Sequence, residues 1–376
     1  MFSLLSIIFI STFLTTLFLV PIVSKACIKF NILDNSIDEQ KKIKKAVLLG
    51  GVAIVFGFLI PFLCFLNGGL QAPFYAPYFR AALLIIFLSG IADDLLIYKP
   101  ITKLLSQFIV CFILIYLCKL GIPTVLFPNI FIPSSILSIV INSLIILICI
   151  NSFNLIDGID GLASSIAIIS LVIYGIIFFI NQSYFYAAMA FGLTGSVFAF
   201  LLYNKSPAHI YMGDSGSLFL GLVLGIFTLV FIQEPKNNLN FTFSTRFILS
   251  LSIIGLPTLD LVRLFFVRIY RNKNPFKGDK MHIHHLLCEL GLTHNQVTFW
   301  LSILHLIFIG IAFLTTAYWI LYFAFAFILY LVFVQIIRQL ITFKNKMKRE
   351  IRANDIQPNE NLNLKNILKL ELKKIV

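Results

Sequence analysis

Charged residues are scarce in this chain. Of its 376 residues, 12% are Asp, Glu, Lys or Arg, which is about half the share found in soluble globular domains. Hydrophobic residues make up 59% of the chain, and 40 residues are Phe. A soluble core cannot enclose so much apolar surface, whereas the hydrocarbon interior of a bilayer can. The composition therefore excludes an ordinary soluble enzyme and predicts a helical protein that crosses a membrane several times.

Paired cysteines and acidic residues are also lacking. The six cysteines are Cys27, Cys64, Cys111, Cys118, Cys149 and Cys288. Most of them lie in or beside apolar segments and none form a CxxC pair, so no disulfide framework is indicated. Lys and Arg outnumber Asp and Glu by 29 to 16. Because the basic residues lie between and after apolar segments, we attribute them to membrane orientation and expect no nucleic-acid partner.

Eleven segments come close to the roughly 20 apolar residues that a spanning helix needs. They lie near 2–24, 48–66, 80–96, 104–120, 134–150, 163–180, 184–202, 216–232, 245–262, 297–316 and 318–342. We predict an all-α, polytopic membrane domain over 1–342 and a basic cytoplasmic tail over 343–376. The first segment has no base before it and no small-residue cleavage pattern, so we expect it to be retained. The tail is either an amphipathic helix on the inner leaflet or partly disordered.

The basic residues predict the orientation of these segments. If the N-terminus is outside, 24 of the 29 Lys and Arg residues fall in cytoplasmic loops or in the tail. This distribution satisfies the positive-inside rule. We therefore expect the N-terminus outside and the C-terminus in the cytoplasm.

Acidic, amide and histidine side chains collect in five short motifs. These are "GIADDLL" with Asp93 and Asp94, "NSFNLIDGIDGLA" with Asn151, Asn154, Asp157 and Asp160, "HIYMGDSGS" with His209, Gly213 and Asp214, "GLPTLDLVR" with Asp260 and Arg263, and "GDKMHIHHLL" with His282, His284 and His285. The orientation assigned from the bases places every motif at a cytoplasmic helix end or loop. Ionisable groups at a membrane are costly, and they indicate function.

The acidic motifs differ in how strongly each indicates function by itself. Asp93 and Asp94 end a predicted helix, where the helix dipole disfavours anions, so they need a metal ion, Lys99 or Lys103 as a partner. Asp157 and Asp160 would share a face if their segment is helical. The alternative is that Asp160 caps the helix that follows.

The glycine and histidine motifs suit phosphate binding. "GDSGS" resembles a phosphate-cradling loop, and the less favoured alternative is a serine nucleophile. The imidazoles of "HIHH" can donate to phosphate oxygens. Zinc ligation and ordinary loop histidines remain alternatives, although the spacing is wrong for zinc. We interpret His209, His294 and His305 as structural. Aspartates without thiolate ligands favour a hard cation such as Mg²⁺, which indicates phosphoryl transfer at the inner face.

The motifs occur in the order and approximate spacing of a known family. "ADDLL…K…KLLSQ", "NSFNLIDGIDGLA", "HIYMGDSGSLFLG" and "GDKMHIHHLL" together resemble the polyprenyl-phosphate N-acetylhexosamine-1-phosphate transferases, which are glycosyl transferase family 4. The resemblance covers about residues 1–340. It implies that undecaprenyl phosphate attacks the sugar-bearing phosphate of a UDP-N-acetylhexosamine, with UMP as the leaving group.

The resemblance also implies residue roles. Asp93, Asp94 and Asp157 are the expected catalytic residues, and Asp214 with Asp93 is expected to bind Mg²⁺, with Mn²⁺ as an alternative. The expected substrate-binding residues are Lys103, Asn154, Asp160, Gly213, His282, His284 and His285. Two departures stand out. "DEQKKIKKAVLLGG" lacks the His and Pro usual in relatives, and Ile97 replaces a third acid.

The expected donor is UDP-N-acetylglucosamine, and the product would initiate a glycan such as O-antigen or teichoic acid. An N-acetylfucosamine, N-acetylquinovosamine or muropeptide donor is the alternative. The expected location is the bacterial inner membrane, with the active site facing the cytoplasm and homodimerisation left open. A secondary transporter or a lipid-linked sugar flippase is the competing class. A transporter would place its polar groups near mid-bilayer depth.

Overall fold

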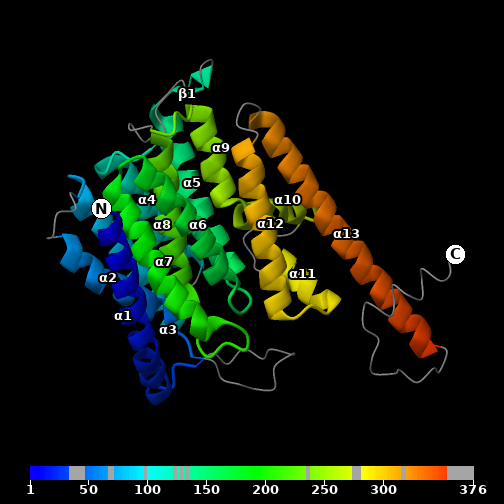
Figure 1. Cartoon of the computed structure of the whole chain (residues 1–376). Helices are drawn as coiled ribbons and strands as arrows, with labels where there is room; N and C mark the ends of the chain where they lie inside the picture. The colour runs from blue at the N-terminus through cyan, green and yellow to red at the C-terminus, as the bar shows by residue number, and fades with distance from the viewer. Residues whose placement is uncertain are drawn as a thin grey trace.

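The computed structural model describes residues 1–33, 47–66, 72–96, 100–121, 125–127, 130–131, 135–233, 238–272, 281–314 and 319–353. These residues are predominantly helical, with one small antiparallel sheet of β1 (Val125–Phe127) and β2 (Ile130–Phe131). The helices are α1 (Phe2–Lys29), α2 (Gly50–Leu66), α3 (Ala76–Leu96), α4 (Pro100–Phe112) continued by the π-helix η1 (Ile113–Leu117), α5 (Ser135–Ile156), α6 (Leu162–Ile180), α7 (Tyr184–Asn204), α8 (Gly213–Gln233), α9 (Phe243–Ile253), α10 (Gly255–Tyr270), α11 (Ile283–Leu290), α12 (His294–Leu314) and α13 (Trp319–Ala353) (Figure 1).

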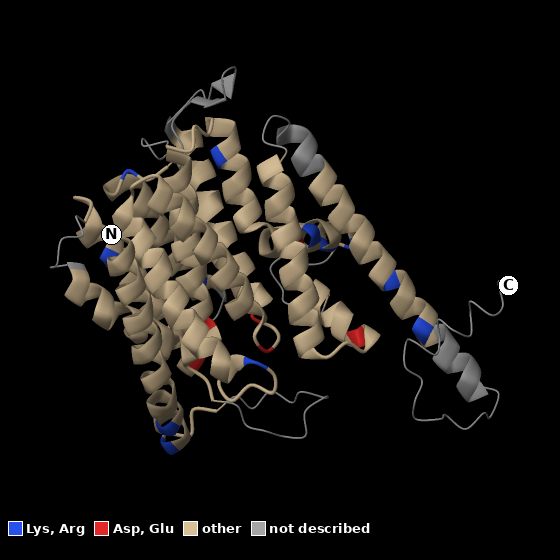
Figure 2. Cartoon of the chain, viewed as in Figure 1, with Lys and Arg blue, Asp and Glu red and all other residues tan. Residues whose placement is uncertain are grey.

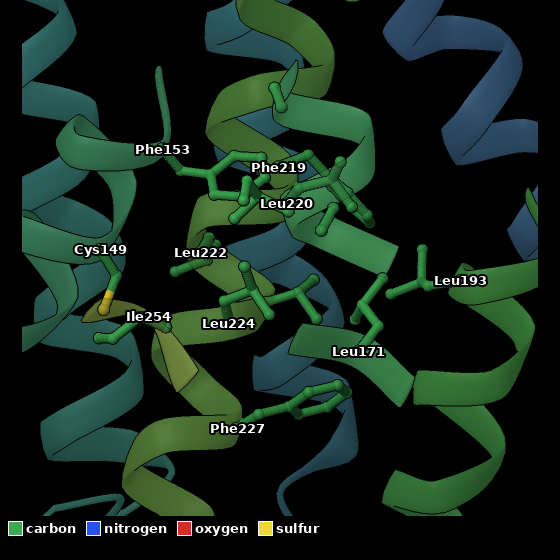
Figure 3. Packing of buried hydrophobic residues seen from close by; sticks show 14 of the residues in the cluster. Cys149, Phe153, Leu171, Leu193, Phe219, Leu220, Leu222, Leu224, Phe227 and Ile254 are labelled. Carbon is green, nitrogen blue, oxygen red and sulfur yellow. The ribbon is translucent and has the colours of Figure 1, made fainter. Parts of the chain in front are cut away.

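Helix α8 is the centre of the bundle. Its sequence is apolar on every side after the first turn, and its spanning stretch is completely buried. A helix that is hydrophobic all round either faces lipid or is enclosed by other helices, and here α2, α3, α5, α6 and α9 pack against α8. Figure 3 shows α8 side chains between Cys149 and Phe153 of α5 on one side and Leu171 of α6 and Leu193 of α7 on the other.

Seven of the described helices are long and apolar enough to cross a membrane: α1, α5, α6, α7, α8, α12 and α13. An eighth span results if α9 and α10 are counted as one. Each of the eleven predicted segments overlaps a helix, but the predicted count of eleven spans is not confirmed. Two of the remaining segments, α2 and α4 with η1, are shorter apolar helices. The chain is a multi-pass helical membrane protein.

The predicted segment 245–262 is broken into two helices. α9 and α10 meet at Ile254 with a bend of 77°. Gly255 and Pro257 follow the break, and proline cannot donate a backbone hydrogen bond to the preceding turn. Backbone carbonyls freed inside a membrane need new donors. The Ser170 hydroxyl donates to the Ile253 carbonyl at 2.7 Å and so satisfies one of them.

Most acidic residues lie toward one end of the bundle. Figure 2 shows the red Asp and Glu residues mainly toward the lower ends of the helices, where α1 also ends with basic residues. The sequence predicted that the acidic motifs share one face, and this arrangement agrees with that prediction. The side of the membrane on which this face lies stays a prediction. α13 runs past the predicted domain boundary at 342, and residues 354–376 lie outside the described residues.

Helices α2 and α8 approach each other through backbone atoms. A Cβ atom on Gly51 would collide with the backbone nitrogen of Gly216 and lie 2.5 Å from its Cα. The backbone N–H of Gly51 donates to the Met212 carbonyl at 2.8 Å. Glycine at 51 therefore fixes the distance between α2 and the start of α8.

We expect Gly51→Ala to destabilise the folded protein by about 1–3 kcal/mol, because the added methyl group meets backbone that cannot move aside. Thermal unfolding of the purified protein in detergent measures this loss. The matched control is Gly310→Ala on α12, where an added Cβ has no neighbour within 4 Å. Equal stability of the two variants would show that the close approach of α2 and α8 does not stabilise the fold.

Candidate active site

The carboxylate of Asp94 caps the N-terminus of α8. The backbone N–H of Asp214 donates to Asp94 Oδ1 at 2.7 Å, and that of Ser215 donates to Oδ2 at 3.0 Å. Gly213 has a left-handed φ of 70°, and a Cβ there would lie 2.7 Å from Asp94 Oδ2. Glycine is therefore required for the carboxylate to reach the helix end. The positive end of the α8 dipole stabilises Asp94, which the end of its own helix would disfavour.

Asp214 is held by two side chains from other helices. Lys103 of α4 forms an ion pair with Asp214 Oδ2 and a second one with Asp93 Oδ2 at 3.2 Å. Asn154 of α5 donates to Asp214 Oδ1 at 2.7 Å and lies 2.8 Å from Ser217 Oγ. The predicted partner of the Asp93–Asp94 pair is thus found, since Lys103 binds Asp93 while α8 binds Asp94. Lys99 lies outside the described residues.

A pair of amide side chains fixes α4 against α5 one turn away from these contacts. Gln107 Nε2 donates to Asn151 Oδ1 at 3.2 Å, and Asn151 Nδ2 donates to Gln107 Oε1 at 2.8 Å. Gln107 is fully buried. Residues three or four apart share a helix face, so the pair sets the positions of both Lys103 and Asn154 relative to Asp214.

Asp157 belongs to the same acidic cluster. Burial and the nearby carboxylates of Asp214, Asp94 and Asp160 raise the pKa of the Asp157 carboxyl well above its usual range. Neighbouring carboxylates disfavour each other's ionised forms, and Lys103 is the cation that the described ion pairs contribute to this cluster. Within the described residues, no group of three or more His, Cys, Asp or Glu forms a complete protein metal site. The excess negative charge suits a cation that takes its other ligands from a substrate.

Asp157 and Asp160 do not share a helix face, so the premise of that prediction is wrong. α5 ends at Ile156, and residues 157–161 form turns. Asp160 does not cap α6 either, because the N-cap is Gly161 and no side chain caps it. Asp160 is buried, and its carboxylate accepts the backbone N–H of Ala208 at 3.2 Å and lies 3.5 Å from His294 Nδ1. These contacts fix the loop, and substrate binding by Asp160 stays a prediction.

The histidine motif meets the acidic loop at Gly158. His284 is buried, and neither of its ring nitrogens has a hydrogen-bond partner among the described residues. A Cβ atom on Gly158 would collide with His284 Nε2, so the ring lies directly on the backbone next to Asp157. Burial and the neighbouring His285 hold the pKa of His284 well below its usual range. His284 is therefore neutral near pH 7 and has one N–H to donate.

Comparison with known proteins agrees with this geometry. The family model described as Glycosyl transferase family 4 matches residues 76–232, which run from α3 to the end of α8 and include the acidic cluster. This match supports the family resemblance that the sequence motifs carry. A Bacillus subtilis (strain 168) protein named as a probable undecaprenyl-phosphate N-acetylglucosaminyl 1-phosphate transferase is 29% identical over 314 residues, which are 82% of this chain and 83% of that protein.

Further relatives carry the same kind of name. A Salmonella typhi protein named undecaprenyl-phosphate alpha-N-acetylglucosaminyl 1-phosphate transferase is 24% identical over 362 residues, which are 91% of this chain and 94% of that protein. An Escherichia coli (strain K12) protein with this name is 29% identical over 151 residues, which are 39% of this chain and 40% of that protein. The similarity to the Salmonella protein thus extends beyond the residues that the family model matches.

Many of the predicted site residues lie close together, while their roles stay predictions. Asp93, Asp94, Asp157, Asp214, Lys103, Asn154 and Gly213 surround the first turn of α8, while His284 reaches the acidic loop. Gln107 and Tyr330 were not predicted. Gln107 stands in a polar motif that could have drawn attention to it. Tyr330 lies in an apolar run, and no local signal marks it.

We expect Asp94→Asn to lower stability by about 1–3 kcal/mol more than Asp93→Asn does. Both changes remove one negative charge from the cluster, but only Asp94 accepts the two N-terminal N–H groups of α8. An amide group can accept with one atom only and would leave one buried donor unsatisfied. Thermal unfolding of the two variants side by side gives the difference. A larger loss in Asp93→Asn would contradict the capping role.

Proposed function

We propose that this protein transfers N-acetylhexosamine-1-phosphate from a UDP-sugar to undecaprenyl phosphate, giving undecaprenyl-diphosphate-sugar and UMP. The family 4 match and the named relatives indicate a phospho-sugar transferase. The single observation that carries the proposal is the convergence of Asp93, Asp94, Asn154 and Asp214 at the N-terminus of α8. Residues far apart in the chain thus bring carboxylates, the Asn154 amide and the Lys103 ammonium group to one place, as phosphoryl transfer requires.

Mg²⁺ is the divalent cation that suits this cluster, with Mn²⁺ as an alternative. Mg²⁺ usually binds one or two carboxylates and completes its shell with water and substrate phosphates. Asp214 and Asp93 would hold it, and the ion pairs of both carboxylates with Lys103 support a shared cation position. When bound, the metal would neutralise the donor diphosphate and polarise the phosphate under attack.

The reaction needs positioning more than proton abstraction. An oxygen of the lipid phosphate forms a bond to the phosphorus that carries the sugar, and the bond to the UMP oxygen breaks with its electron pair leaving on UMP. A phosphate monoester has a second pKa near 6, so the acceptor is already largely a dianion at neutral pH. The protein therefore contributes mainly by orienting two anions, with Lys103, His282, His284 and His285 donating to phosphate oxygens.

The acceptor's isoprenoid chain needs an apolar surface close to the site. A cavity of about 200 Å³ lies beside the α9–α10 bend and is lined almost entirely by apolar atoms. Ile145 of α5, Phe308 of α12 and Ala326 of α13 form parts of its wall. This lining suits a hydrocarbon chain and offers little to a sugar or a nucleotide.

The proposed donor comes from the names of the relatives, and the proposed location comes from the positions of basic residues. N-acetylglucosamine-1-phosphate appears in their names, so we propose UDP-N-acetylglucosamine as donor and a product that initiates a cell-surface glycan. The active site would face the cytoplasm from the inner membrane, because the acidic face is also where α1 ends with basic residues. A transporter is disfavoured, because the acidic groups of the α8 cluster lie at helix ends rather than in the middle of spans.

A direct assay tests the proposal. Purified protein in detergent receives labelled UDP-N-acetylglucosamine, undecaprenyl phosphate and Mg²⁺, and the products are labelled lipid and UMP in equal amounts. We expect chelation by EDTA to abolish turnover and added Mg²⁺ to restore it. Absence of product with every UDP-N-acetylhexosamine supplied would refute the proposed reaction.

We expect Asp214→Asn to reduce turnover at least about 100-fold while the protein still folds, because one interaction aimed at transition-state charge is worth this much in other enzymes. Thermal unfolding and elution as a single folded species serve as the control for folding. Wild-type turnover in Asp214→Asn would exclude Asp214 as a metal ligand.

A further inference from the structure

A second carboxylate cluster lies on α10, outside the acidic cluster at α8. Asp260 Oδ1 accepts hydrogen bonds from Arg263 Nη2 at 2.6 Å and from the Tyr330 hydroxyl at 2.8 Å. Asp260 Oδ2 lies 2.8 Å from His282 Nδ1 and accepts the backbone N–H of Ile283 at 3.4 Å. One carboxylate therefore joins α10, the start of α11 and α13.

The members of this cluster are withdrawn from solvent. Asp260 is 5% exposed, Arg263 2%, His282 4% and Tyr330 1%. A buried carboxylate is tolerated only when charged and hydrogen-bonding partners satisfy it. Asp260 has both kinds of partner, so its position is closely specified by four groups from three segments.

The cluster anchors the histidine motif. Arg263 Nη2 also donates to the Met281 carbonyl at 2.8 Å, so residues 281–283 are bound to α10 by backbone and side-chain contacts. At the other end of α11, Lys344 of α13 donates to the Glu289 and Leu290 carbonyls at 2.9 and 2.8 Å. α13 therefore binds the C-terminal end of the histidine helix directly and its N-terminal end through Asp260, and Figure 1 shows α13 passing α10 and α11.

The contact with Asp260 decides which nitrogen His282 presents. Nδ1 is engaged, and the buried Nε2 has no hydrogen-bond partner among the described residues. The ring is stacked on that of His284, with centroids 5.6 Å apart and planes 12° from parallel. His284 in turn lies on Gly158 beside Asp157. The Asp260 cluster is thus connected to the acidic loop through two stacked imidazoles.

We propose that Asp260 is a positioning residue, held in place by Tyr330 of α13, which directs His282 Nε2 toward a substrate phosphate. This inference rests on the proposed function, because it concerns how the same reaction is supported. Tyr330 touches no substrate in this account and acts through Asp260 and His282. The residues that bind the metal and those that orient the histidines therefore form two separate sets, and α13 belongs to the second.

The test compares two buried tyrosines. Tyr330→Phe removes the hydroxyl that binds Asp260, and Tyr174→Phe removes an equally buried hydroxyl that lies 2.8 Å from Thr228, away from both clusters. We expect Tyr330→Phe to lower kcat about 5- to 10-fold with little change in KM for the UDP-sugar, because the orienting contact matters most in the transition state. Tyr174→Phe should keep kcat within about twofold of wild type.

A double-mutant cycle separates positioning from a general loss of structure. In a His282→Ala background, Tyr330→Phe should cause no further loss of kcat, since it acts through a side chain that is already absent. Multiplied losses in the double variant, or equal losses of kcat in Tyr330→Phe and Tyr174→Phe, would overturn the inference. Should Tyr330→Phe fail to fold, Asp260→Asn is measured in the same cycle with the same expectation. Inactive wild-type protein would instead refute the proposed function, so the two failures are distinguishable.

Discussion

The site is organised by the hydrogen bonds between the Asp94 carboxylate and the first two backbone N–H groups of α8. They join the C-terminus of α3 to the N-terminus of α8. The dipole of α8 stabilises the Asp94 carboxylate, whereas the dipole of α3 destabilises it. Asp93 and Asp214 are brought together as a direct result, and Lys103 binds both. Without this cap, Lys103 alone would have to offset the repulsion between the carboxylates of Asp93, Asp94 and Asp214.

Two groups of side chains have separate roles in the proposed reaction. The carboxylates at α8 would hold a divalent cation and the donor diphosphate, while the histidines of 282–285 would donate N–H groups to phosphate oxygens. The groups meet where His284 lies on Gly158. A larger residue at 158 would push the histidine away from Asp157, which explains why the acidic loop needs a glycine at this position.

Much of this arrangement could be predicted from the sequence. Composition identified a helical membrane protein, because apolar runs of this length have few other stable environments. The distribution of basic residues predicted that the motifs share one face, and Asp93, Asp94, Asp157 and Asp214 do lie together.

The sequence pattern did not reveal that Asp157 and Asp160 lie in turns. The two acids are three residues apart, which is also the spacing of neighbours on a helix face. The 77° bend at Ile254 was also missed, because the apolar pattern continues across Gly255 and Pro257. Tyr330 was missed because its importance comes from a carboxylate 70 residues away in the chain.

We propose that the carboxylates around the start of α8 hold one divalent cation together with the donor. Electron paramagnetic resonance of Mn²⁺ titrated into the purified protein with UDP-N-acetylglucosamine measures this binding most directly. We expect one Mn²⁺ per chain that Mg²⁺ displaces, and loss of that site in Asp214→Asn. No stoichiometric Mn²⁺ in the wild-type protein, or unchanged binding in Asp214→Asn, would contradict the proposal.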